Sequence, residues 1–159
     1  MTGGIGSGKS TIAAMLQDTP GVFVIDSDRV AKEIVLNHRC RVARIIGVTL
    51  EEFSLALTAQ IIFSDLRKKA LLENYIHPLV KKRIWRMLRP RPEQIIIIES
   101  ALIFERNWQE EFDLIIAAVC PPRIQIARVQ KRSNWTKQKV LERMNSRSVQ
   151  SFIVNTLLS

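Results

Sequence analysis

The feature that most constrains this chain is a glycine-rich loop close to its beginning. Residues 3–10 match the pattern G-x-x-x-x-G-K-[ST] at every fixed position. Glycines allow backbone angles that turn successive N–H groups inward, and a helix starting near Lys9 would direct its positive end at the same point. The pattern therefore predicts a binding loop for the phosphates of a nucleoside triphosphate. The alternative is a glycine-rich turn that contains a lysine by chance.

Each residue of this phosphate loop has an expected part in binding. Lys9 would reach the β- and γ-phosphates, the hydroxyl of Ser10 would bind Mg²⁺, and Thr11 would add a hydroxyl near the α-phosphate. The residues expected to bind the nucleotide are Gly3, Gly4, Ile5, Gly6, Ser7, Gly8, Lys9, Ser10 and Thr11. Such a loop normally follows a buried strand. Since little sequence precedes Gly3, we expect the loop to be weakly anchored and the chain to carry no signal peptide.

Strands and helices are expected to alternate along the chain. Short apolar runs predict strands at residues 22–25, 95–98 and 114–119. Helices are predicted over residues 10–17, 29–36, 122–131 and 136–146. Residues 50–88 are expected to be wholly helical, with a new helix opening at His77-Pro78. Ser27 or Asp28 is expected to cap the helix that runs from Arg29.

This alternation indicates an α/β fold with a parallel sheet and flanking helices, of the kind found in P-loop nucleotide-binding proteins. We expect residues 1–159 to form a single domain. A helical lobe over about residues 37–92 would bind the acceptor, and a lid over about residues 123–147 would cover the site.

The charge of the chain points to an anionic partner. The formal net charge is +9, and basic residues are concentrated in residues 81–91 and 123–147. Nucleic acid, anionic lipid and phosphorylated small molecules would all fit this surplus. Because aromatic residues for base stacking make up only 6% of the chain, we expect no nucleic-acid partner.

Composition also suggests where the protein works. The longest aliphatic run, residues 95–98, is far shorter than the roughly 18 to 20 residues of a membrane span, so we expect no membrane association. Cys40 and Cys120 are isolated, which is typical of reduced thiols in a cytoplasmic protein. We expect a cytoplasmic enzyme that is monomeric or weakly associated.

Acidic and basic residues elsewhere are candidates for the chemistry. Asp26 and Asp28 follow a predicted strand, where a carboxylate can accept a proton from an attacking hydroxyl or hold the metal. Asp28 could instead be only a helix cap. Glu99 also ends a strand, although strands often end in an acid, and Glu105 is equally ambiguous.

Two arginines are candidates for stabilising the transferring phosphoryl group. Arg128 and Arg132 are four residues apart and share one helix face. On a lid they would stabilise negative charge and exclude water. The alternative is a solvated basic face. Trp135 beside them could pack on an adenine or, as we expect, in the core.

Several motifs resemble those of the dephospho-CoA kinases. The resemblance covers almost the whole chain, in five motifs of matching order and spacing. They are the opening residues 2–11, VIDSD at 24–28, the helical stretch IIFSD at 61–65 with LE at 72–73 and IHPL at 76–79, LIFE at 102–105, and the lid at 128–132 with RMN at 143–145.

The resemblance implies an activity and an assignment of residues. Dephospho-CoA kinases use ATP, with Mg²⁺, to phosphorylate the ribose 3′-hydroxyl of dephospho-CoA. It implies that Asp28 is the base, with Lys9 and Arg132 stabilising the transferring group. It also implies that the helical lobe with His77 helps hold dephospho-CoA. Asp26, Asp28 and Glu105 are further candidates for contacting the acceptor, and Ser10 and Asp26 are the candidates for holding the metal.

Some positions depart from the family's usual pattern. Leu55 replaces an arginine, Glu99 an aspartate, Ala101 a proline and Arg147 a glutamine, and the chain stops before the last strand and helix of the family. Two alternatives therefore remain open. One is a degenerate homologue that binds nucleotide with little turnover, and the other is a basic ATP-binding protein associated with nucleic acid.

Overall fold

The computed structural model describes residues 1–89, 93–100, 103 and 108–145. The chain divides into two compact units, which are described separately below. The first comprises residues 1–25 together with the chain from residue 94 onwards, and the second comprises residues 26–93. Strands and the phosphate loop belong to the first unit, whereas the second is helical in its described part.

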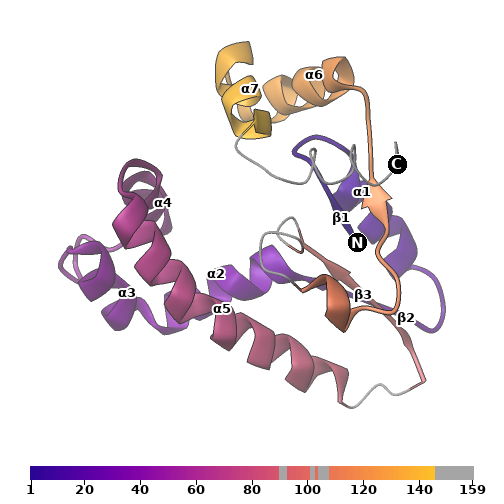
Figure 1. Cartoon of the computed structure of the whole chain (residues 1–159), viewed down its shortest axis with the longest axis horizontal. Helices are drawn as coiled ribbons and strands as arrows, with labels where there is room; N and C mark the ends of the chain where they lie inside the picture. Colours follow the sequence, from indigo (N-terminus) through magenta and orange to yellow (C-terminus); the bar gives the residue numbers. More distant parts are fainter. Residues whose placement is uncertain (90–92, 101–102, 104–107, 146–159) are drawn as a thin grey trace. The chain divides into compact units, whose positions relative to one another are not determined.

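The first unit combines short strands with helices (Figure 1). Its strands are β1 (Thr2–Gly3), β2 (Val22–Asp26, whose last residue begins the second unit), β3 (Ile95–Glu99) and β4 (Ala117–Ala118). Its helices are α1 (Lys9–Gln17), α6 (Pro122–Ser133), α7 (Lys137–Asn145) and a short 3₁₀ turn at Gln109–Glu111. This confirms the predicted α/β class.

The strands form two hydrogen-bonded pairs, β1 with β4 and β2 with β3, and backbone bonds of Met1, the residue before β1, link the two pairs. β1 pairs with β4 in parallel, with Thr2 opposite Ala117. On its other side, the Met1 amine donates to the carbonyl of Ile98 at 2.7 Å, and the N–H of Ser100 donates to the carbonyl of Met1 at 3.0 Å. This alternation is the bonding pattern of a parallel pair. β1, although short, is thus paired with β4, and the residue before it is bonded to Ile98 of β3 and to Ser100.

β2 and β3 also run in the same direction. The N–H of Ile95, the first residue of β3, donates to the carbonyl of Gly21, which immediately precedes β2, at 2.9 Å. Because the beginnings of the two strands are bonded to each other, β2 and β3 are parallel. β4 is shorter than the predicted strand over residues 114–119, because its partner β1 offers only two residues for pairing.

The second unit consists of four helices that bury aliphatic side chains against one another. They are α2 (Ser27–Asn37), α3 (Arg39–Ile46), α4 (Leu55–Ser64) and α5 (Leu66–Leu88), and α5 packs against the other three. On α5, Leu72, Ile76, Val80 and Ile84 are buried at intervals of four residues. This spacing places them on one face, as expected for a helix whose opposite face meets water.

The start of α2 differs from the prediction. The helix begins at Ser27 rather than Arg29, and its cap is Asp26, not Ser27 or Asp28. The Asp26 carboxylate accepts hydrogen bonds from the N–H groups of Asp28 at 2.9 Å and Arg29 at 3.0 Å. Aspartate suits this position because its short side chain can reach the unpaired N–H groups of the first turn.

The middle of the chain also differs from the prediction. A helix was expected to open at Pro78, but Pro78 lies inside the continuous α5. A proline removes one helical hydrogen bond, yet the helix continues because buried side chains on both sides of it, Ile76 and Val80, pack in the same core. Residues 50–54 are not helical, and the serine at the end of this stretch, Ser54, caps α4. α3 was not predicted.

Candidate active site

The phosphate loop links β1 to the first turn of α1. Gly8 is the residue before the helix and has a φ of 97°, while Gly6 has a φ of 75°. Both angles lie in the left-handed region that side chains disfavour. Among the described residues, no side chain caps the N–H groups of α1. These donors and the positive end of the helix dipole are therefore available to an anion.

The glycine at the tip of the loop is also required by packing. A Cβ added to Gly6 would lie 2.7 Å from the carbonyl oxygen of Gln125 and 2.9 Å from Cγ2 of Val129. Both of these residues belong to α6, so the helix lies directly against the loop. The sequence motif requires glycine only at its first and sixth positions, and this requirement at Gly6 comes from the tertiary structure.

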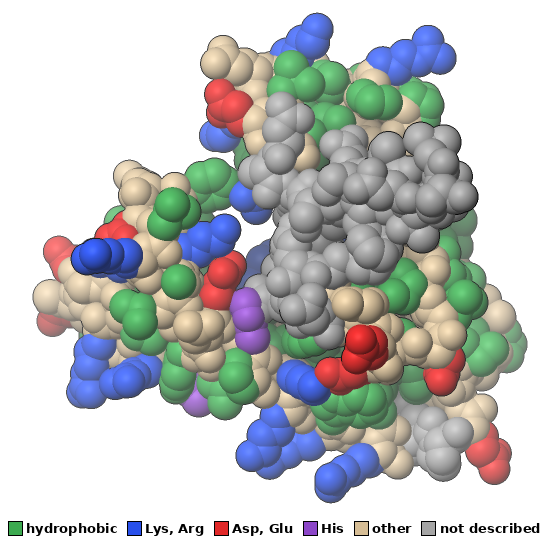
Figure 2. Space-filling view, viewed as in Figure 1, with side chains coloured by type: hydrophobic (Ala, Val, Ile, Leu, Met, Phe, Trp, Pro, Cys, Tyr) green, Lys and Arg blue, Asp and Glu red, His purple; other side chains and the backbone are tan. Residues whose placement is uncertain are grey.

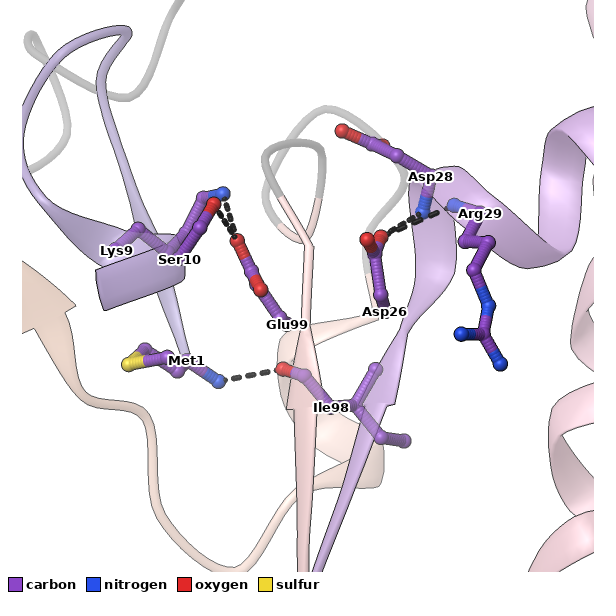
Figure 3. A network of polar contacts seen from close by, with 8 residues as sticks. All are labelled: Met1, Lys9, Ser10, Asp26, Asp28, Arg29, Ile98 and Glu99. Carbon is purple, nitrogen blue, oxygen red and sulfur yellow. Dashed lines mark hydrogen bonds and ion pairs between the residues drawn. The ribbon is translucent and has the colours of Figure 1, made fainter. Parts of the chain in front are cut away.

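Lys9 and Ser10 share one partner, Glu99 at the end of β3 (Figure 3). The ammonium of Lys9 lies 2.6 Å from Oε1 of Glu99, and the hydroxyl of Ser10 donates to the same oxygen at 2.7 Å. The side chains of Lys9 and Glu99 are only 12% and 8% exposed. We call these three residues the Glu99 cluster.

The backbone on either side of Glu99 is bonded to Met1. Ile98 accepts from the Met1 amine and Ser100 donates to the Met1 carbonyl, as described for the sheet. Burial lowers the pKa of the Met1 amine, while the negative charge of Glu99 opposes this change. From the sequence, Glu99 could be either a functional acid or an ordinary acid at the end of a strand. Its contact with Lys9 joins residues that are 90 positions apart. The signal in the sequence was an acid that directly follows an apolar run.

Arg128 contacts the backbone of the phosphate loop from α6. Its Nη1 lies 3.4 Å from the carbonyl of Gly6 and 3.5 Å from that of Ser7, at the long end of the hydrogen-bond range. Arg132 lies one turn further along α6 and is exposed. Both predicted arginines therefore lie on the helix that meets the loop, with Arg128 at the loop itself.

Apolar packing also connects α6 and α7 to the loop. Val129, Val140 and Met144 form a buried cluster, and the loop residue Ile5 packs against it. Trp135 packs against the same cluster, as the core alternative predicted. Ile5 therefore does more than fill a variable position of the motif, because it attaches the loop to the two helices.

The remaining predicted residues fall outside the first unit or outside the described residues. Asp26 and Asp28 are exposed at the start of α2, and no hydrogen bond to the Asp28 carboxylate is found among the described residues. One oxygen of Asp26 is engaged in capping the helix (Figure 3). His77 is half-buried on α5. Glu105 lies outside the described residues.

The described residues contain neither a metal-binding cluster of acidic, His and Cys side chains nor a membrane-spanning helix. No group of three or more His, Cys, Asp or Glu side chains is arranged there to hold a metal ion. No helix in the same part of the chain is long and apolar enough to cross a membrane. The Ser10 hydroxyl and the Glu99 carboxylate nevertheless bring oxygen atoms together, and oxygen is the ligand that Mg²⁺ prefers.

A parallel sheet, a glycine loop between β1 and α1, and a lysine and serine at the helix start define a P-loop nucleotide-binding protein. The family model for dephospho-CoA kinase matches residues 1–151. The dephospho-CoA kinase of Moorella thermoacetica is 33% identical over 157 residues, which cover 92% of this chain and 74% of that protein. That of Thermobifida fusca is 31% identical, over 93% of this chain and 78% of its own length.

A solved structure agrees with these sequence matches. The crystal structure of TT1252 from Thermus thermophilus matches with a TM-score of 0.84 and 29% identity, over 92% of this chain and 77% of that one. The chain belongs to the dephospho-CoA kinase family, which confirms the resemblance seen in its motifs. It is therefore a kinase of the P-loop class, with ATP as the phosphate donor.

Proposed function

We propose that this chain transfers the γ-phosphate of ATP to the ribose 3′-hydroxyl of dephospho-CoA, giving coenzyme A and ADP. The single observation that carries the donor half of this proposal is the Glu99 cluster at the start of α1. It gathers a cation, a hydroxyl and a carboxylate beside a loop whose helix N–H groups no described side chain caps. Membership of the family supports the acceptor half.

The donor would be held mainly by backbone and cationic groups. The N–H groups of the loop and of the first turn of α1 would bind the phosphate oxygens, with Lys9 between the β- and γ-phosphates. Arg128 and Arg132 would stabilise charge on the transferring group, since preorganised cations act where charge develops. This support is stronger for Arg128, which contacts the loop.

Oxygen donors beside the loop fit Mg²⁺. We propose that Ser10 and Glu99 hold the ion, because their oxygens lie 2.7 Å apart and one of them is ionised. Mg²⁺ would neutralise charge on the β- and γ-phosphates. Asp26 is a third proposed metal ligand. One of its carboxylate oxygens accepts hydrogen bonds from backbone N–H groups, which leaves the other oxygen for the metal.

We assign proton removal to Asp28. In the reaction the 3′-hydroxyl oxygen forms a bond to the γ-phosphorus, the bond to the bridging β–γ oxygen breaks, and ADP leaves. The hydroxyl proton would pass to the Asp28 carboxylate, which is exposed and so accessible to an acceptor. His77 and Glu105 are proposed to contact the acceptor on the strength of the family motifs.

A coupled ADP-release assay with dephospho-CoA tests this proposal. We expect acceptor-dependent turnover that Lys9→Ala abolishes, and we expect Asp28→Asn to reduce the phosphoryl-transfer rate by about 100-fold or more, the usual scale of a general base. Asp113→Asn, at another exposed aspartate, is the matched control and should keep the original rate. Nucleotide binding without turnover would point to the degenerate homologue instead, and a normal rate for Asp28→Asn would remove that residue as the base.

The proposed activity also indicates which molecules this positively charged chain binds. A phosphorylated small molecule accounts for the positive charge of the chain without nucleic acid, and Figure 2 shows Lys and Arg side chains in several separate groups on the face it displays. We propose a cytoplasmic enzyme, monomeric or weakly self-associating, that binds neither nucleic acid nor membrane. Turnover stimulated by oligonucleotide with a steep salt dependence would contradict this.

A further inference from the structure

The second half of α5 carries a basic surface to which the proposed activity assigns no ligand. The chain has no acidic residue between Glu73 and Glu93. Exposed side chains of this stretch share one face of the helix, because residues three, four and seven positions apart lie above one another. They are Lys82, Trp85, Arg86 and Arg89, with Arg83 beside them, and we call these five residues the α5 stripe.

The opposite face of α5 explains why the stripe meets solvent. Val80 and Ile84 are 5% and 3% exposed and lie in the helical core, whereas Trp85 is 44% exposed. Lys and Arg side chains gather where α5 ends, at the lower edge of the view (Figures 1 and 2). Neither of the two ion pairs found in the described part of the chain includes a residue of the stripe. Four cations therefore surround an exposed indole ring, and no described acidic side chain pairs with them.

The helix dipole accounts for only part of this arrangement. Cations are favourable beside the carbonyl groups at the end of a helix, but the effect falls off within the last turn. Arg86 lies in the last turn of α5, whereas Lys82 and Arg83 lie further back. The dipole also gives no reason to expose Trp85, since burying an aromatic ring is favourable. The remaining explanation is a partner that covers the stripe.

The residue types of the stripe favour a protein partner. Tryptophan and arginine are the side chains that most often dominate the binding energy of protein–protein interfaces. Three of the four cations are arginines, whose planar guanidinium group binds a carboxylate through two parallel hydrogen bonds. A lipid surface fits less well, because an interfacial helix inserts its apolar face and that face of α5 is buried in the core. Single-stranded nucleic acid would need successive aromatic rings for stacking, and the stripe has one.

We infer that the α5 stripe is a docking surface for an acidic segment of another protein, which would place carboxylates on the arginines and an apolar side chain on Trp85. The negative charge of such a segment complements the four cations, and covering the ring removes apolar surface from water. The inference goes beyond the proposed function and does not depend on it. No residue of the stripe is assigned to nucleotide, acceptor or metal, so docking requires neither ATP nor turnover.

Fluorescence anisotropy with the full chain tests the inference. The probe is a short fluorescein-labelled peptide of repeated Glu-Glu-Leu units, in about 0.15 M salt so that long-range attraction is screened. We expect binding that the corresponding Gln-Gln-Leu peptide lacks. Arg83→Gln combined with Arg86→Gln should raise the Kd for the acidic peptide at least about tenfold.

A second pair of arginines provides the matched control. Arg39→Gln combined with Arg44→Gln removes two exposed charges from α3 and leaves the same net charge as the variant of the stripe. This control should change the Kd by less than about twofold. Trp85→Ala changes no charge and should nevertheless weaken peptide binding at least about tenfold, because the ring is the apolar part of the surface.

Several outcomes would overturn the inference. They are no binding of the acidic peptide, equal weakening by the two arginine pairs, and an unchanged Kd for Trp85→Ala. Tighter binding of a duplex oligonucleotide or of phosphatidylserine vesicles, lost in the variant of the stripe, would assign the surface to nucleic acid or lipid instead. A higher KM for dephospho-CoA in that variant would assign it to the acceptor. Peptide binding without turnover rejects the proposed function alone, whereas turnover without peptide binding rejects this inference alone.

Discussion

The contact between the phosphate loop and α6 can be tested by adding one methyl group at Gly6. Gly6 has a φ of 75°, and a Cβ there would lie 2.7 Å from a backbone oxygen and 2.9 Å from Val129. Gly21 provides a matched control, because its φ is 78° and a Cβ added to it meets no atom of the described residues within 4 Å. Gly6→Ala and Gly21→Ala therefore share the backbone strain and differ in the clash.

The magnitude follows from these two contributions. A left-handed conformation destabilises alanine by about 1–2 kcal/mol, and forcing a methyl group into a packed site adds about 1–3 kcal/mol. We expect Gly21→Ala to lower the free energy of unfolding by about 1–2 kcal/mol and Gly6→Ala by about 2–5 kcal/mol. For a chain of this size, each kcal/mol corresponds to about 2–4 °C in Tm.

Thermal unfolding and calorimetric ATP binding would measure both variants. Gly6→Ala should also bind ATP less tightly, because the obstructing atom is backbone and the loop itself must shift, which displaces the N–H groups that we propose bind the phosphates. Small misplacements of this kind reduce function by as much as about 100-fold. Equal Tm values for the two variants, with ATP affinity unchanged in Gly6→Ala, would refute the packing of α6 against the loop.

Three further substitutions test other parts of the structure. Val129→Ala removes two methyl groups from a site that is 0% exposed, so the free energy of unfolding should fall by about 2–3 kcal/mol in urea titration, and a loss under about 0.5 kcal/mol would contradict its burial. Pro78→Ala should stabilise the protein by about 1–3 kcal/mol, because an exposed proline inside α5 is replaced by a better helix former, and destabilisation would argue against a continuous helix. Hydrogen bonds from the N–H and hydroxyl of Thr49 lower the pKa of Glu52 by stabilising its charged form. Thr49→Val removes the hydroxyl and should raise the pKa of Glu52 towards its ordinary value in an NMR titration. An unchanged pKa would count against the hydrogen bond from the hydroxyl.

Local spacing was sufficient to predict much of the first unit. The phosphate loop, α1, β2 and β3 were recognised because glycine positions, apolar runs and turn residues act over a few neighbouring residues. β4 was predicted too long, because the length of a strand depends on its partner as well as on its own residues. The assigned roles of Asp28, His77 and Glu105 stay predictions.

In the helical unit, tertiary packing overrides some of the helix boundaries that local sequence patterns predict. Proline normally opens or interrupts a helix, yet α5 continues through Pro78 because a core on both sides of it stabilises the helical backbone. The cap of α2 moved from the two predicted residues to Asp26 because the helix starts two residues earlier than its apolar pattern suggested. These differences change the helix boundaries and leave the fold class as predicted.

The sequence by itself determined the kind of ligand, because a phosphate loop is a short motif whose backbone angles and charges depend on adjacent residues. The tertiary structure decided which residues complete the site. Glu99 meets Lys9 across 90 positions, and α6 meets Gly6 across more than a hundred, through strand order and helix packing that no local pattern records. Contacts of this range depend on how the whole chain folds, and so the partner of Lys9 could be seen only in three dimensions.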